Sequence, residues 1–279
     1  MAKVFVTGAN GYIGSHVVKA LCDTGAEVVA CDFQSGRIDG RAEFRAVDVL
    51  ARAADADLFR DVGNPDAVVH LAWADGFNHG ADGHLNNLPR HYAFVKNMID
   101  AGVKSVSVMG TMHEIGCWDG EIDAATPCNP MSLYGIAKNA LRQAVLIYAK
   151  GKAVSVKWLR AFYITGDDAA NHSVFAKILQ MAQEGKTSFP FTTGENKYDF
   201  EDIRTLARQI AAASVQNEID GIINVCSGRP VSLKDKVEEF IAKNGLNIRP
   251  EYGAFPSRPY DSPCLYGNAD LIAKIMKEV

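Results

Sequence analysis

The sequence lacks several features that would place it in a particular class of protein. No apolar run approaches the ~20 residues that a membrane-spanning helix requires, so we expect no membrane partner. The 29 Lys and Arg nearly balance the 33 Asp and Glu, and the pI near 6.0 gives no indication of a surface for nucleic acid. The six cysteines are scattered without a C-x-x-C pair, and no signal-peptide pattern precedes the first apolar run. We therefore expect a cytoplasmic protein with reduced thiols.

The histidines do not have the spacing of a metal site. His79, His84 and His91 are five and seven residues apart, which does not bring two ligands onto one helical turn, and no cysteine accompanies them. We expect no metal, and we interpret these three residues as solvated loop histidines.

Apolar runs that predict strands alternate with helical patterns through the first 160 of the 279 residues. This alternation is typical of an α/β protein in which a doubly wound parallel sheet, of the Rossmann type, carries helices on both faces. The expected strands are 4–6, 27–31, 44–47, 67–71, 103–109 and 154–159, and the expected helices are 11–22, 85–101 and 134–150.

The pattern changes after about residue 160. Helices are expected at 173–184 and 203–213, apolar runs lie at 188–191 and 222–226, and Ser232 begins another helix in the manner of a capping box. We predict a nucleotide-binding domain over residues 1–160. Residues 161–279 are expected to form a small substrate-binding lobe interleaved with the last strands of the sheet.

A glycine-rich segment, Thr7-Gly8-Ala9-Asn10-Gly11-Tyr12-Ile13-Gly14, joins the first expected strand to the first expected helix. In this context glycines allow a tight turn and a close approach of the backbone to a pyrophosphate, which the N-terminus of the helix favours. Asp32 ends the second strand about 20 residues later, where a carboxylate can accept hydrogen bonds from ribose hydroxyls and repels a 2′-phosphate. NAD is therefore favoured, although Arg37 could neutralise a 2′-phosphate and leaves NADP open.

A phenol and an ammonium group lie four residues apart in Tyr134 and Lys138, on one face of an expected helix. A nearby positive charge is expected to lower the pKa of the phenol towards the range that is useful for proton transfer. Thr111 follows the fifth strand, at the edge of the sheet where open α/β folds place ligands. The cofactor-binding residues expected from these positions are Gly8, Asn10, Gly11, Tyr12, Ile13, Asp32, Arg37, Asp48, Val49, Leu71, Ala72, Trp73, Tyr134 and Lys138.

These motifs together resemble the extended short-chain dehydrogenases/reductases of the NAD-dependent epimerase/dehydratase family. The likeness extends along nearly the whole chain and includes the active-site pair Tyr134 and Lys138. It is carried further by segments 7–14, 70–72, 111–116, 159–166, 198–203 and 258–261.

The resemblance implies that Thr111, Tyr134 and Lys138 are catalytic and that hydride passes between a nicotinamide and a nucleotide-linked sugar. It also implies a homodimer formed through helices 85–101 and 134–150. The substrate-binding residues that it implies are His113, Asn171, Phe189 and Arg258.

Departures from the family pattern bear on the reaction. Met112 stands where 4,6-dehydratases carry an acidic residue, and the substrate lobe is short. The chain most resembles the 4-ketoreductases of dTDP-6-deoxy-4-ketohexoses, of the dTDP-6-deoxy-talose 4-dehydrogenase type. Two alternatives stay open: a nucleotide-sugar 4-epimerase with tightly bound NAD, and a non-catalytic nucleotide-sensing regulator.

Overall fold

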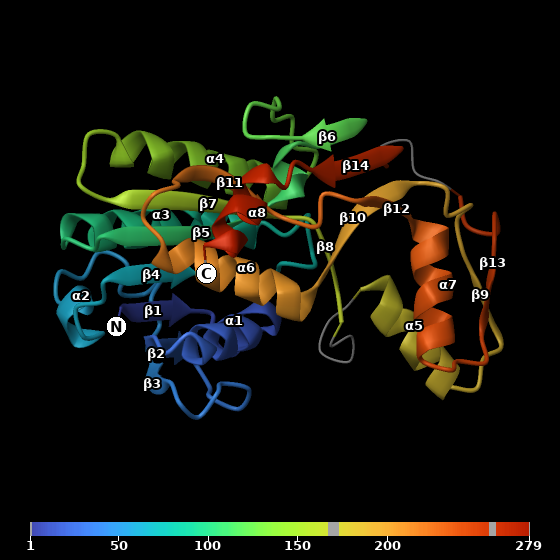
Figure 1. Ribbon diagram of the computed structural model, residues 1–279, viewed down its shortest axis with the longest axis horizontal. Helices are drawn as coiled ribbons and strands as arrows, with labels where there is room; N and C mark the ends of the chain where they lie inside the picture. Colours follow the sequence, from blue (N-terminus) through green and yellow to red (C-terminus); the bar gives the residue numbers. More distant parts are fainter. Residues whose placement is uncertain (1, 167–172, 257–260, 279) are drawn as a thin grey trace.

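The computed structural model describes residues 2–166, 173–256 and 261–278. These residues form a parallel sheet covered by helices and a smaller lobe beside it, which carries α5, α7, β9 and β13 (Figure 1). The sheet has seven strands in the order β11-β7-β5-β4-β1-β2-β3, and every neighbouring pair is parallel. The predicted α/β fold class is confirmed. The strands are β1 (Lys3–Thr7), β2 (Glu27–Asp32), β3 (Glu43–Ala46), β4 (Ala67–His70), β5 (Ser105–Thr111), β7 (Ser155–Ala161) and β11 (Gly221–Val225).

The apolar side chains of β1 explain how the sheet is covered on both faces. Val4 and Val6 point into the core against α1 (Tyr12–Asp23), α6 (Ile203–Val215) and α8 (Asp270–Lys277). Phe5 points into the opposite core. That second core lies against three other helices, namely α2 (Leu58–Asp61), α3 (Gly83–Asp100) and α4 (Leu133–Ala149). None of the helices in the described ranges is both long enough and apolar enough to cross a membrane.

The second half of the chain contributes to both parts of the molecule. Its β11, α6 and α8 complete the large sheet and its helical layer, whereas a second sheet and a two-stranded pair build the lobe. A third apolar core lies within this lobe. The lobe elements are β6 (Gly120–Ile122), β8 (Tyr163–Thr165), α5 (Val174–Gln183), β9 (Ser188–Pro190), β10 (Lys197–Asp202), β12 (Pro230–Ser232), α7 (Leu233–Lys243), β13 (Arg249–Glu251) and β14 (Cys264–Gly267).

Strand β10 was not predicted, and its charged residues explain why. Asp199 is fully buried, and its carboxylate accepts hydrogen bonds from the backbone N–H groups of Ser227, Gly228 and Gly267. These donors stabilise the buried carboxylate, so the strand tolerates aspartate, a residue type that is rare in strands.

Candidate active site

The glycine loop between β1 and α1 has the geometry that a dinucleotide requires. Gly8 has a φ of +68°, and a Cβ atom added there would lie 2.6 Å from the backbone nitrogen of Ala72. Gly11 begins α1, and no side chain caps that helix. The backbone N–H groups of the first turn are therefore presented without a capping side chain, as binding of a pyrophosphate requires.

Asp32 and Arg37 both contact this loop, Arg37 through its backbone nitrogen. The Asp32 carboxylate accepts hydrogen bonds from the backbone nitrogens of Asn10, at 2.9 Å, and Phe33, at 2.7 Å. The Asn10 side-chain oxygen accepts a hydrogen bond from the backbone nitrogen of Arg37 at 2.7 Å. This arrangement fixes the carboxylate beside the loop, where it fits the ribose of an adenosine.

The other expected cofactor residues have identifiable local roles. Asp48 accepts hydrogen bonds from the backbone nitrogens of the two residues 50 and 51, and Val49 is buried in the core beneath α2 and α3. The Tyr12 hydroxyl donates to the carbonyl oxygen of Gly166 at 2.6 Å, which ties α1 to the end of β8. Ile13 and Leu71 pack partly buried on the α1 side of the sheet.

Of the three histidines that follow β4, His79 lies half-buried in a loop, whereas His84 and His91 are buried, so the prediction that these last two are solvated loop residues is wrong. Both lie in α3 and are 1% exposed. His91 shares a hydrogen bond of 2.9 Å with His70, and His70 shares one of 2.8 Å with Thr7. His84 accepts a hydrogen bond from the Trp73 indole nitrogen at 3.0 Å. No group of three His, Cys, Asp or Glu is placed to hold a metal ion among the described residues.

The structure brings together the three residues predicted to be catalytic. Thr111 ends β5, and Tyr134 and Lys138 lie in the first two turns of α4. Thr111 and Tyr134 share a side-chain hydrogen bond. The Lys138 ammonium donates to the carbonyl oxygen of Met109 at 2.8 Å and lies 3.8 Å above the centre of the Trp73 ring.

The pKa of Tyr134 differs from the expectation. Burial raises it to about 12, and the hydrogen bond with Thr111 opposes this effect. Burial also lowers the pKa of Lys138 to about 7, with Glu114 acting in the opposite direction. The expected lowering of the phenol pKa by Lys138 is therefore wrong for this structure, because the desolvation of both groups outweighs the effect of a neighbouring charge.

Glu114 contacts the backbone of Thr111 from the interior of the protein, and this role was not identified from the sequence. It lies fully buried in the short 3-10 helix η1 (Met112–Glu114), which follows β5. Its carboxylate accepts hydrogen bonds of 2.8 Å from the backbone nitrogen of Thr111 and from the indole nitrogen of Trp158. The second carboxylate oxygen lies 3.5 Å from Arg142 and from Arg160. Glu114 thus fixes the backbone at Thr111.

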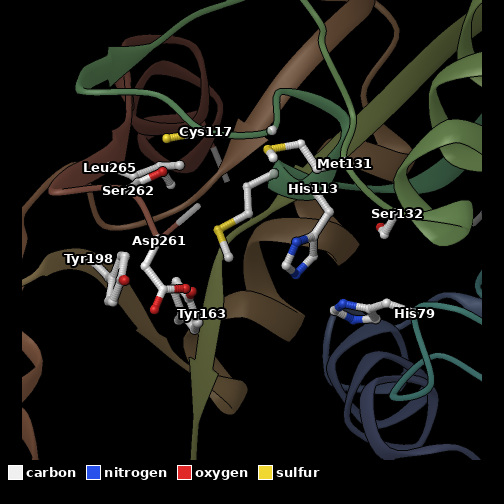
Figure 2. Close-up of a pocket in the computed structure, with 12 residues that line it drawn as sticks. His79, His113, Cys117, Met131, Ser132, Tyr163, Tyr198, Asp261, Ser262 and Leu265 are labelled. Carbon is white, nitrogen blue, oxygen red and sulfur yellow. The ribbon is translucent and has the colours of Figure 1, made fainter. Parts of the chain in front are cut away.

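A pocket of about 350 Å³ lies between the end of β5 and the lobe (Figure 2). Thr111, Tyr134 and Lys138 are not among its lining residues, but the rings of His79 and His113, which line it, contact the Tyr134 ring. His113, predicted to bind substrate, lines the pocket. Phe189 does not: its side chain packs on Phe191 in the lobe core. The expected substrate residues Asn171 and Arg258 lie outside the described residues. Sequence reasoning missed the lining residues His79, Met131, Ser132, Tyr163, Tyr198, Asp261 and Ser262.

Comparison with known proteins agrees with this geometry. Residues 4–226 match the family described as the NAD dependent epimerase/dehydratase family. The chain is 46% identical, over 271 aligned residues, to a dTDP-6-deoxy-L-talose 4-dehydrogenase (NAD(+)) of Aggregatibacter actinomycetemcomitans. The alignment covers 95% of this chain and 99% of that enzyme.

Two solved structures share the fold at low sequence identity. A UDP-N-acetylglucosamine 4-epimerase of Methanobrevibacter ruminantium superposes with a TM-score of 0.84 at 22% identity, covering 98% of this chain and 91% of the epimerase. A UDP-glucose 4-epimerase of Thermotoga maritima gives 0.81 at 21% identity, with the same coverage.

Proposed function

The chain belongs to the NAD dependent epimerase/dehydratase family, and from that membership we propose a nucleotide-sugar oxidoreductase. The proposed reaction is reduction of the 4-keto group of a dTDP-6-deoxy-4-ketohexose with NADH, or oxidation of the 4-hydroxyl in the reverse direction. The observation that carries this proposal is the grouping of Thr111, Tyr134 and Lys138, with the Tyr134 ring in contact with two residues that line the pocket, His79 and His113. The relative that is 46% identical over nearly its whole length supports the choice of sugar and cofactor.

In the proposed reaction, each of the three residues acts at a defined atom. The Tyr134 hydroxyl donates a proton to the sugar oxygen on reduction and accepts it on oxidation. Thr111, which already hydrogen-bonds Tyr134, holds the same oxygen. Lys138 is held by Met109 and Trp73 within reach of a nicotinamide ribose. The bound nicotinamide supplies or accepts the hydride.

The residues present fit NAD. The uncapped N-terminus of α1 and the close approach of Gly8 to Ala72 suit the pyrophosphate, and Asp32 suits the adenosine ribose. A 2′-phosphate would lie beside the Asp32 carboxylate, so we propose that NADPH is the poorer coenzyme.

We also propose that the protein is a homodimer joined through α3 and α4. The two helices pack on each other, and α4 presents Ile136 and Ile147 at 42% and 65% exposure on one face, while α3 exposes Leu85. Exposed apolar side chains grouped on neighbouring helices are typical of a subunit interface. A monomer mass by light scattering at micromolar concentration would contradict this assembly.

All six cysteines are free, which supports a reducing compartment such as the cytoplasm.

Oxidation of NADH at 340 nm tests the proposed reaction. We expect consumption that depends on a dTDP-4-keto-6-deoxyhexose and falls to background with Tyr134→Phe. A 4-epimerase would retain NAD through purification and consume no added NADH. Activity of Tyr134→Phe equal to that of the wild type would contradict the active-site assignment.

A further inference from the structure

His79 lies against the catalytic tyrosine through both its backbone and its ring. It belongs to the loop between β4 and α3, and its carbonyl oxygen accepts a hydrogen bond of 3.0 Å from the backbone nitrogen of Tyr134. The two rings are stacked, with centres 5.0 Å apart and planes at 14°. The loop is thereby fastened to the start of α4, and the imidazole is held at a fixed place beside the phenol.

His113 also contacts the ring of Tyr134, with the ring centres 5.9 Å apart. Its backbone nitrogen donates to the Thr111 hydroxyl at 3.3 Å, and its ring lies edge-on to that of His79 with centres 4.3 Å apart. Figure 2 shows the two imidazoles turned towards each other at the lining of the pocket. His79 from a loop and His113 from η1 thus both contact the Tyr134 ring.

Both imidazoles are neutral near pH 7. Burial lowers the pKa of His113 to about 4, and the neighbouring His79 acts in the same direction. Burial and His84 lower the pKa of His79, against a hydrogen bond with the backbone of Gly76. Because one ring nitrogen of neutral His79 is engaged by the Gly76 backbone, the other nitrogen is left to accept a hydrogen bond, which suits a sugar hydroxyl and not an anion.

We propose that His79, together with His113, binds the sugar hydroxyl on the carbon next to the reacting carbon. This inference rests on the proposed function, in which Tyr134 and Thr111 contact the oxygen at carbon 4. The His79 ring is stacked on the Tyr134 ring and lines the pocket, so a sugar bound at Tyr134 would bring a group next to carbon 4 towards it. Carbon 4 of a 6-deoxy-4-ketohexose has two neighbours. Carbon 5 carries a methyl group and no hydroxyl, so the neighbouring hydroxyl is the one on carbon 3. His79 is therefore a specificity residue for sugars that retain the 3-hydroxyl.

A cycle of variants and substrates separates this role from simple packing. His79→Phe keeps the stacked ring and removes the polar nitrogens. The dTDP-4-keto-6-deoxyhexose and its 3-deoxy analogue are each assayed with NADH for wild type and variant. We expect His79→Phe to lower kcat/KM about 5- to 20-fold for the 3-hydroxy substrate, as loss of one hydrogen bond implies, and to leave the 3-deoxy substrate unchanged.

Two binding measurements and a second variant complete the design. Affinities for NADH and for dTDP without a sugar should equal those of the wild type, because His79 contacts neither in this proposal. Like His79→Phe, His113→Phe should lower kcat/KM for the 3-hydroxy substrate and leave kcat/KM for the 3-deoxy substrate unchanged. This second variant keeps the test decisive if His79→Phe does not fold.

The outcomes separate this inference from the proposed function. Equal losses of kcat/KM on both substrates for His79→Phe would mean that His79 only packs against Tyr134. An unchanged kcat/KM on both substrates would show that His79 binds no hydroxyl. Either result overturns the inference and leaves the proposed function standing. A wild-type protein that turns over neither ketosugar would contradict the proposed function and this inference with it.

Discussion

Removal of the Glu114 carboxylate should cost a large part of the stability of the protein. Glu114→Ala leaves two buried donors, the Thr111 backbone nitrogen and the Trp158 indole, without their acceptor. It also leaves the fully buried Arg160 guanidinium without its anion, although one of its nitrogens keeps the Asp123 carbonyl oxygen at 2.9 Å.

Two independent estimates of the magnitude agree. A hydrogen bond to a charged group contributes about 1.5–3 kcal/mol, so the loss of two amounts to about 3–6 kcal/mol. Removal of one partner from a buried ion pair costs about 3–5 kcal/mol. We expect the free energy of unfolding to fall by about 4 kcal/mol, out of a typical total of roughly 5–15 kcal/mol.

Urea unfolding followed by tryptophan fluorescence and circular dichroism measures this loss. Glu121→Ala is a matched control because Glu121 is exposed, and its change should lie within about 0.5 kcal/mol. Suppose that Glu114→Ala lowers the free energy of unfolding by less than about 1 kcal/mol, with an unchanged slope against urea concentration. That result would show that the Glu114 carboxylate is not important for the stability of the structure around Thr111.

Three further predictions concern the site and its surroundings. Tyr134→Phe should keep the NADH affinity of the wild type and lose about 10²–10⁴-fold in kcat, because it removes the proton donor; a kcat within tenfold of wild type would contradict its role. Gly8→Ala should weaken NADH binding measured by calorimetry, since its Cβ atom would lie 2.6 Å from the Ala72 nitrogen at a φ of +68°, and an unchanged affinity would contradict the loop assignment. Burial keeps the pKa values of His70, His91 and His113 in the folded protein below the usual value near 6.5. As the pH falls below 6.5, these histidines are protonated in the unfolded chain but stay neutral in the folded protein. Stability should therefore drop by about 1 kcal/mol per histidine between pH 6 and 5, and a midpoint of urea unfolding that is constant over this range would show that these histidines are not buried in the neutral form.

The large sheet could be predicted because its strands follow the simplest pattern. Val4, Phe5 and Val6 are fully buried on both faces, and a continuous apolar run of this kind indicates a covered parallel strand. The glycine turn, the hydroxyl at the end of β5 and the Tyr134/Lys138 pair are likewise local features, and the structure brings the three predicted catalytic residues together.

What escaped prediction depends on contacts between distant segments. The lobe strands are short, and β10 buries Asp199 on backbone donors from two other segments. His91 reads as a polar loop residue until the fold brings it to His70. Glu114 lies next to His113 in the chain, yet its side chain turns into the protein, where Trp158 and Arg160 from β7 meet it, while His113 lines the pocket.

The most direct test of the central claim is the oxidation of NADH by purified protein in the presence of a dTDP-4-keto-6-deoxyhexose. We expect stoichiometric conversion of NADH and ketosugar, with NADPH less effective because of the Asp32 carboxylate. Protein that retains tightly bound NAD, consumes no added NADH and interconverts nucleotide sugars would contradict this expectation and establish the epimerase reaction instead.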